Sequence, residues 1–115
     1  MTRDGSIRDR VKAIQVRLRD EDVSPAEARS ALVTLTALLG NVNEELRAAD
    51  MVYKGVLLGA LKTAETANRA RIEAETTPAY GRAREAKDTK DLTVEMIRSL
   101  KAYMRSLEEE LRLSR

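Results

Sequence analysis

The feature that most constrains this chain is an apolar heptad repeat in its first half. Apolar residues recur there in alternating steps of four and three, at Ala28, Leu32, Leu35, Leu39, Val42, Leu46, Ala49, Tyr53, Val56 and Ala60. Ten positions in one register are typical of a coiled-coil seam rather than of a globular helix. The register continues more weakly through Ala67, Ala70 and Ala74. The pattern therefore predicts one long helix over residues 25–75.

The start of this helix carries a strong local signal in the segment Ser24-Pro25-Ala26-Glu27. Ser at the N-cap, Pro at the first helical position and Glu three residues after the Ser form a capping box. Before it, a single apolar stripe predicts a shorter helix over 4–22, capped by Asp4 or Ser6. The stripe consists of Ile7, Val11, Ile14 and Leu18.

A second heptad register follows Pro78 and predicts a long helix over 80–113. Its members are Ala79, Ala83, Ala86, Lys90, Thr93, Ile97, Leu100, Met104, Leu107 and Leu111. Pro78 disfavours helix at Thr77, so a turn is expected over 76–79. In both registers the large apolar residues lie far from this turn, and the positions near it are mainly alanine. An antiparallel hairpin would therefore pair large residues with large residues and alanines with alanines. The alternative is that 76–81 forms a kink in one continuous helix.

The composition removes most catalytic chemistry. The chain has no His, Cys, Trp or Phe, and 35% of its residues are charged. Without imidazole or thiolate it has no usual general base, nucleophile or zinc site. Glu85, Asp88 and Asp91 share a helix face, but ion pairs with Arg84 and Lys87 explain them. We expect no enzymatic activity, no cofactor, no metal and no small-molecule substrate.

The net charge and the apolar content of the chain indicate which partners and which cellular location to expect. It has 115 residues and a net charge of +2, so its basic character is weak support for a nucleic-acid partner. The N-terminal stretch has no apolar signal-peptide region, and no window approaches the roughly 18 apolar residues of a membrane span. We expect a cytoplasmic protein, in the host cytoplasm if a phage encodes it, with no membrane partner.

The apolar stripes are wider than a two-helix hairpin can cover, so self-association is expected. The predicted fold is therefore all-α: a short N-terminal helix and a long antiparallel coiled-coil hairpin in a single domain over 1–115, assembled as a homo-oligomer. The residues expected at the interface with other copies or with a protein partner are Leu38, Val52, Leu57, Leu61, Ile97, Leu100, Met104 and Leu107.

Basic residues gather on both sides of the predicted turn. They are Arg69, Arg71, Arg82, Arg84, Lys87 and Lys90, with Tyr80 among them. At a hairpin tip, arginines would meet phosphates and the tyrosine ring would stack on a base of single-stranded nucleic acid. Alternatively, i,i+4 pairs such as Arg69–Glu73 and Arg71–Glu75 neutralise the cluster, and Tyr80 packs beside Pro78.

Residues 50–111 resemble the small all-helical phage recombination mediators of the UvsY type. The shared layout is a Tyr-containing helix (AADMVYKGVLLGALK), an Arg-Ile-Glu-Ala segment at 71–74, a break, a basic run and a second amphipathic helix. Arg82-Ala83-Arg84 matches the family's basic-Ala-Arg triplet, although the Pro-Ala-Tyr-Gly stretch before it departs from the family pattern. The resemblance implies ring-like homo-oligomers, and it assigns phosphate contact to Arg82 and Arg84.

The leading hypothesis is a non-enzymatic accessory of phage-type recombination. Such a protein binds single-stranded DNA and helps to load a recombinase onto strands covered by single-strand-binding protein. The alternative is a coiled-coil structural, adaptor or inhibitor protein that binds a protein partner through its apolar stripe and has no affinity for nucleic acid.

Overall fold

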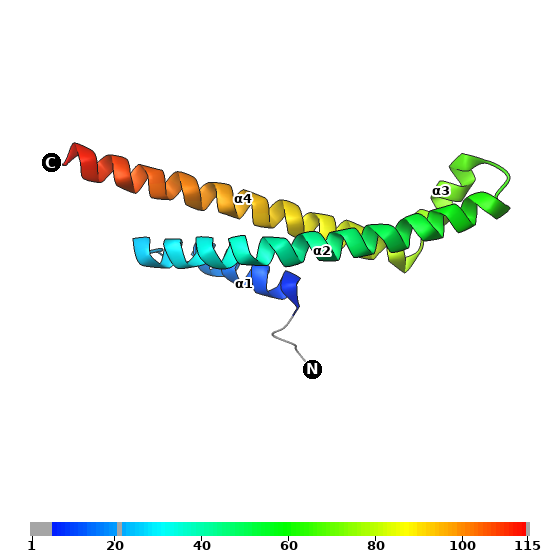
Figure 1. Cartoon of the computed structure of the whole chain (residues 1–115), viewed down its shortest axis with the longest axis horizontal. Coiled ribbons are helices and arrows are strands. Elements are labelled where there is room, and N and C mark those ends of the chain that lie inside the picture. The colour runs from blue at the N-terminus through cyan, green and yellow to red at the C-terminus, as the bar shows by residue number, and fades with distance from the viewer. Residues whose placement is uncertain (1–5, 21, 115) are drawn as a thin grey trace. The chain divides into compact units, whose positions relative to one another are not determined.

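The computed structural model of the chain describes residues 6–20 and 22–114. These residues form four helices, α1 (Ile7–Asp20), α2 (Pro25–Thr63), α3 (Ala67–Glu75) and α4 (Pro78–Leu113) (Figure 1). The all-helical class is therefore confirmed. Contacts group the chain into two compact units, where the sequence predicts one domain. Unit 1 comprises Met1–Asn41 and Asp91–Arg115, and unit 2 comprises Val42–Lys90.

Unit 1 has a core made by α1, the first part of α2 and the last part of α4. The fully covered side chains include Val11 of α1 and Leu35 of α2, and α4 adds residues of its apolar half. The buried apolar set is Val11, Ala28, Leu35, Leu38, Met96, Ile97 and Leu100. Five of these seven residues come from the stripe in 7–18 or from the two heptad registers, so the apolar periodicity identifies most of the packed surface. Leu38 and Met96 lie next to the registers and widen the buried faces.

Capping residues fix the beginnings of α1 and α2. The Ser6 hydroxyl accepts the Asp9 amide at 3.1 Å, so of the two expected caps Ser6 is used, and Asp4 lies outside the described residues. The helix α2 begins at Pro25, where the capping box predicts it, and the Ser24 hydroxyl accepts the Glu27 amide at 3.1 Å. The Ser24 hydroxyl also donates to the Glu27 carboxylate at 3.3 Å.

Two contacts join the elements of unit 1. The Arg17 guanidinium of α1 forms an ion pair with the Glu27 carboxylate at the start of α2. The same contact is a hydrogen bond from Arg17 to Glu27, and it is the main reason that the pKa of Glu27 is lowered. The Tyr103 hydroxyl of α4 donates to the Val23 carbonyl at 2.9 Å, which ties α4 to the segment between α1 and α2.

In unit 2 the chain reverses at residues 64–66, between α2 and α3. Thr66 is the N-cap of α3, with φ −136° and ψ 156°, and its hydroxyl accepts the Arg69 amide at 3.1 Å. At the other end of α3, Glu75 lies close enough to Tyr53, well before the end of α2, to influence its pKa. Figure 1 shows α3 beside the end of α2.

The single helix predicted over 25–75 is therefore wrong at 64–66. No Gly or Pro marks this break; Thr63, Thr66 and Asn68 surround it, and such side chains bond to nearby backbone groups and favour helix caps. The break predicted over 76–79 is shorter in the structure, because only residues 76 and 77 separate α3 from α4, which begins at Pro78 rather than at residue 80. Residues 76 and 77 link α3 to α4, and their backbone amides donate hydrogen bonds to carbonyls of α3, Thr76 to Glu73 at 3.3 Å and Thr77 to Ala74 at 3.2 Å.

Candidate nucleic-acid interface

The seven residues predicted to bind nucleic acid all belong to unit 2, on α3 and on the first part of α4. The two arginines of α3 lie beside carboxylates of the same helix. The Arg69 side chain is 3.6 Å from the Glu73 carboxylate, and that of Arg71 is 3.8 Å from the Glu75 carboxylate. Arg71 also donates to the Asn68 amide oxygen at 2.8 Å. For Arg69 and Arg71 the structure therefore agrees with the interpretation in which i,i+4 ion pairs neutralise the basic cluster.

Tyr80 packs against Tyr53 of α2. The ring centroids are 5.2 Å apart and the rings are inclined at 56°. The Arg84 guanidinium donates to the Tyr80 hydroxyl at 3.3 Å and lies 5.9 Å from the ring centroid. The ring is half-buried. Tyr80 therefore has two neighbours inside the unit, and the structure does not present it as an open platform for a base.

Sequence reasoning placed Tyr53 in the heptad seam but did not identify it as the partner of Tyr80. Burial of the Tyr53 hydroxyl raises its pKa, and the charge of Glu75 adds to the shift. A tyrosine at a seam position signals packing, but its partner depends on where the chain reverses. Because the reversal was expected at 76–79, the pairing of Tyr53 with Tyr80 was missed.

The arginines of α4 have a different environment from those of α3. Arg82 is exposed, and none of the ion pairs found between described residues involves its side chain. The hydrogen bond from Arg84 goes to the Tyr80 hydroxyl and is the main cause of the raised pKa of Arg84, to which the charges of Asp88 and Glu75 also contribute. Lys87 is exposed and Lys90 is half-buried. Arg82 and Arg84 are thus both exposed, and neither belongs to an ion pair found between described residues.

Residues predicted for a partner or oligomer interface separate into two groups. Leu38, Ile97 and Leu100 are 3%, 9% and 6% exposed, because the helices of unit 1 cover them. Their assignment to an intermolecular surface is therefore corrected: they belong to the core. Val52 and Leu61 are exposed in unit 2. The remaining three, Leu57, Met104 and Leu107, are half-buried.

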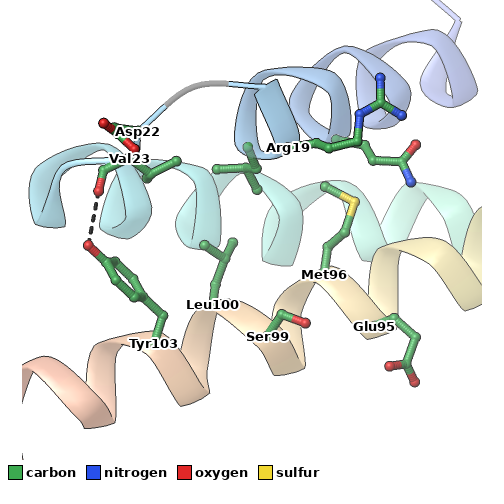
Figure 2. A pocket seen from close by; sticks show the side chains of 10 residues that line it. Arg19, Asp22, Val23, Glu95, Met96, Ser99, Leu100 and Tyr103 are labelled. Carbon is green, nitrogen blue, oxygen red and sulfur yellow. Dashed lines mark hydrogen bonds between the residues drawn. The ribbon is translucent and has the colours of Figure 1, made fainter.

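Unit 1 contains an open pocket of about 690 Å³ that sequence reasoning did not predict. Figure 2 shows Tyr103 of α4 directed at Val23, with Leu100 and Met96 extending from the same side of α4. The remaining lining residues are Gln15, Leu18, Arg19, Asp22, Glu95 and Ser99. Apolar side chains with a few polar groups around them are typical of pockets that receive a ligand or a side chain of a partner protein.

Among the described residues, no group of three or more acidic side chains is arranged to hold a metal ion. Among the same residues, no helix combines the length and apolar character that crossing a membrane requires.

Comparisons with protein-family models, with curated proteins and with solved structures found no match for this chain.

Proposed function

We propose that this chain is a non-enzymatic protein that binds single-stranded nucleic acid through Arg82 and Arg84 at the start of α4. The observation that carries the proposal is the difference between α3 and α4. On α3, Glu73 and Glu75 already lie beside Arg69 and Arg71. On α4, the hydrogen bond of Arg84 goes to the Tyr80 hydroxyl rather than to a carboxylate, although the charges of Asp88 and Glu75 act on it. Arg82 is exposed, and no ion pair found between described residues involves it.

The geometry of this segment suits the backbone of a flexible strand. The helix α4 begins at Pro78, so its N-terminal amide groups and their positive dipole end lie one turn before Arg82. Contact with phosphates needs no particular base, and it is compatible with a Tyr80 ring that packs on Tyr53. The likeness to UvsY-type mediators supports DNA as the strand and loading of a recombinase as its purpose.

The proposed assembly is an antiparallel hairpin that closes at 64–66 rather than at 76–79, in a homo-oligomer. Several copies would repeat the same pair of arginines along one strand. Such repetition raises the overall affinity although each single contact is weak. The recombinase and the single-strand-binding protein are the proposed protein partners.

The test is fluorescence anisotropy of a labelled oligo-dT strand at several salt concentrations. The double variant Arg82→Ala/Arg84→Ala should bind roughly ten-fold more weakly, and its plot of log K against log salt should be shallower by about 1.4, the value for two lost contacts to a single strand.

The matched control is Arg69→Ala/Arg71→Ala, which removes two arginines at the same spacing and changes the net charge equally. A local contact predicts a smaller loss for the control, whereas equal losses would show that only the total charge matters. Absence of binding by the wild-type protein at low salt would refute the proposal.

A second candidate function is favoured by the pocket of unit 1, whose apolar wall includes Met96 and Leu100. It suits an apolar side chain of a protein partner. A protein that does not bind oligo-dT but is retained by a partner through this pocket would be the adaptor or inhibitor of the alternative hypothesis.

A further inference from the structure

A second heptad register lies on the part of α2 that belongs to unit 2, on the side opposite to the buried seam. It steps by four, three, four, three and four residues, and all its members are exposed. Its central large side chains, Met51 and Leu58, are 68% and 56% exposed. This surface, called the outer face below, consists of Glu44, Ala48, Met51, Gly55, Leu58 and Lys62.

The order of residues on the outer face is complementary to itself when reversed. If a second copy of the helix lies antiparallel, with Tyr53 of each copy at the same level, every member of the face meets another member. The pairs are Glu44 with Lys62, Ala48 with Leu58, and Met51 with Gly55, each formed twice. Opposite charges meet at both ends, and a large side chain meets a small one at every position between them.

Glycine gives the outer face the space that this arrangement needs. A Cβ atom placed on Gly55 would meet nothing within 4 Å, so the surface above this residue is open. The long, unbranched Met51 side chain of a second copy can lie over it. Gly59 has the same open surroundings and lies one turn further along the helix. A glycine in a helix interior costs about 1 kcal/mol relative to alanine, so close approach by another helix gives Gly55 a role.

The charged ends of the outer face are available for pairing. Among the ion pairs found between described residues, none uses Glu44 or Lys62. A parallel pair in register would instead place Glu44 against Glu44 and Lys62 against Lys62. Charge and side-chain size therefore both favour the antiparallel arrangement over the parallel one.

From these observations we infer that two copies of this chain pair antiparallel through the outer face of α2. None of the arginines in the proposed contact with DNA takes part, so the dimer interface does not overlap that contact and can be tested without nucleic acid. It supplies an interface for self-association that differs from the stripe of Leu38, Val52, Leu57 and Leu61 singled out from the sequence. The outer face has only six residues per copy, so the buried area is small and the dimer should dissociate on dilution.

The test is analytical ultracentrifugation of the full chain over a range of concentrations, with charge-reversed variants. Glu44→Lys alone and Lys62→Glu alone should each weaken the dimer roughly ten-fold, because each turns two attractive pairs into two repulsive ones. The double variant Glu44→Lys/Lys62→Glu restores opposite charges at both ends and should return the dissociation constant to within about three-fold of the wild-type value. Failure of the double variant to recover would overturn the antiparallel register.

A variant of glycine provides a second, independent measurement. Gly55→Leu fills the space for Met51 and should weaken the dimer at least as much as either charge reversal. Gly81→Leu is the matched control, because Gly81 lies within α4 and also has open surroundings. Circular dichroism should show unchanged helicity for both. A monomeric wild-type protein at its highest soluble concentration, or a dimer that Gly55→Leu leaves intact, would refute the proposal.

Discussion

The reversal of the chain at 64–66 can be tested by one substitution whose expected sign depends on the structure. At an N-cap, Thr66→Ala removes the hydroxyl that accepts the Arg69 amide at 3.1 Å. The loss of such a cap costs about 1 kcal/mol of the free energy of unfolding, within a range of roughly 0.5–2 kcal/mol. In an uninterrupted helix over 25–75, the same substitution would stabilise by up to about 0.7 kcal/mol, because alanine is the better helix former.

The assay is urea denaturation followed by circular dichroism. If Thr66 is the N-cap, Thr66→Ala should lower the urea concentration at the midpoint of unfolding. The dependence of the free energy of unfolding on urea should not change, since the amount of surface exposed on unfolding stays the same. Thr66→Asp should retain most of the wild-type stability, because aspartate is an equally good cap. Thr63→Ala is the control: Thr63 is the last residue of α2, and its hydroxyl only donates to the Ala60 carbonyl at 3.4 Å. A Thr66→Ala protein that is more stable than the wild type would show that the helix continues through 64–66.

Two further predictions concern unit 1. Tyr103→Phe removes the hydrogen bond to the Val23 carbonyl and should lower the free energy of unfolding by about 1 kcal/mol, measured by urea denaturation; an unchanged midpoint would contradict that bond. Glu27 has a lowered pKa in the folded protein, chiefly through Arg17, so its stabilising effect is present above its pKa in the unfolded chain and is lost as pH falls through the lower folded value. Glu27→Gln should therefore reduce the loss of stability on acidification, and equal acid sensitivity in both proteins would refute this.

The sequence predicts what is local and periodic in this fold. The ten seam positions between Ala28 and Ala60 are all buried or half-buried, and the capping box marks the first residue of α2. These features depend on neighbours in the chain or on helical spacing, so a single sequence contains them. The break at 64–66 was missed because alanines on both sides of Thr66 are compatible with an unbroken helix.

The candidate site was predictable in composition but not in detail. Spacing identified the pairs Arg69–Glu73 and Arg71–Glu75, which the structure contains, because both members lie on one helix. The hydrogen bond from Arg84 to Tyr80 also spans four residues, but a neighbouring carboxylate, Asp88, was expected as its partner. Where a side chain has two possible partners at the same spacing, packing with other helices decides which partner it bonds to. The spacing of residues in the sequence does not show this packing.

The contact of Tyr53 with Tyr80 also gives each unit its own optical signal. The chain has no tryptophan and three tyrosines, of which Tyr53 and Tyr80 lie in unit 2 and Tyr103 lies in unit 1. In a Tyr103→Phe protein, all tyrosine fluorescence and near-ultraviolet dichroism would come from the paired rings. The melting of unit 2, and the arrival of a DNA strand beside Arg84, would then be visible without any attached dye.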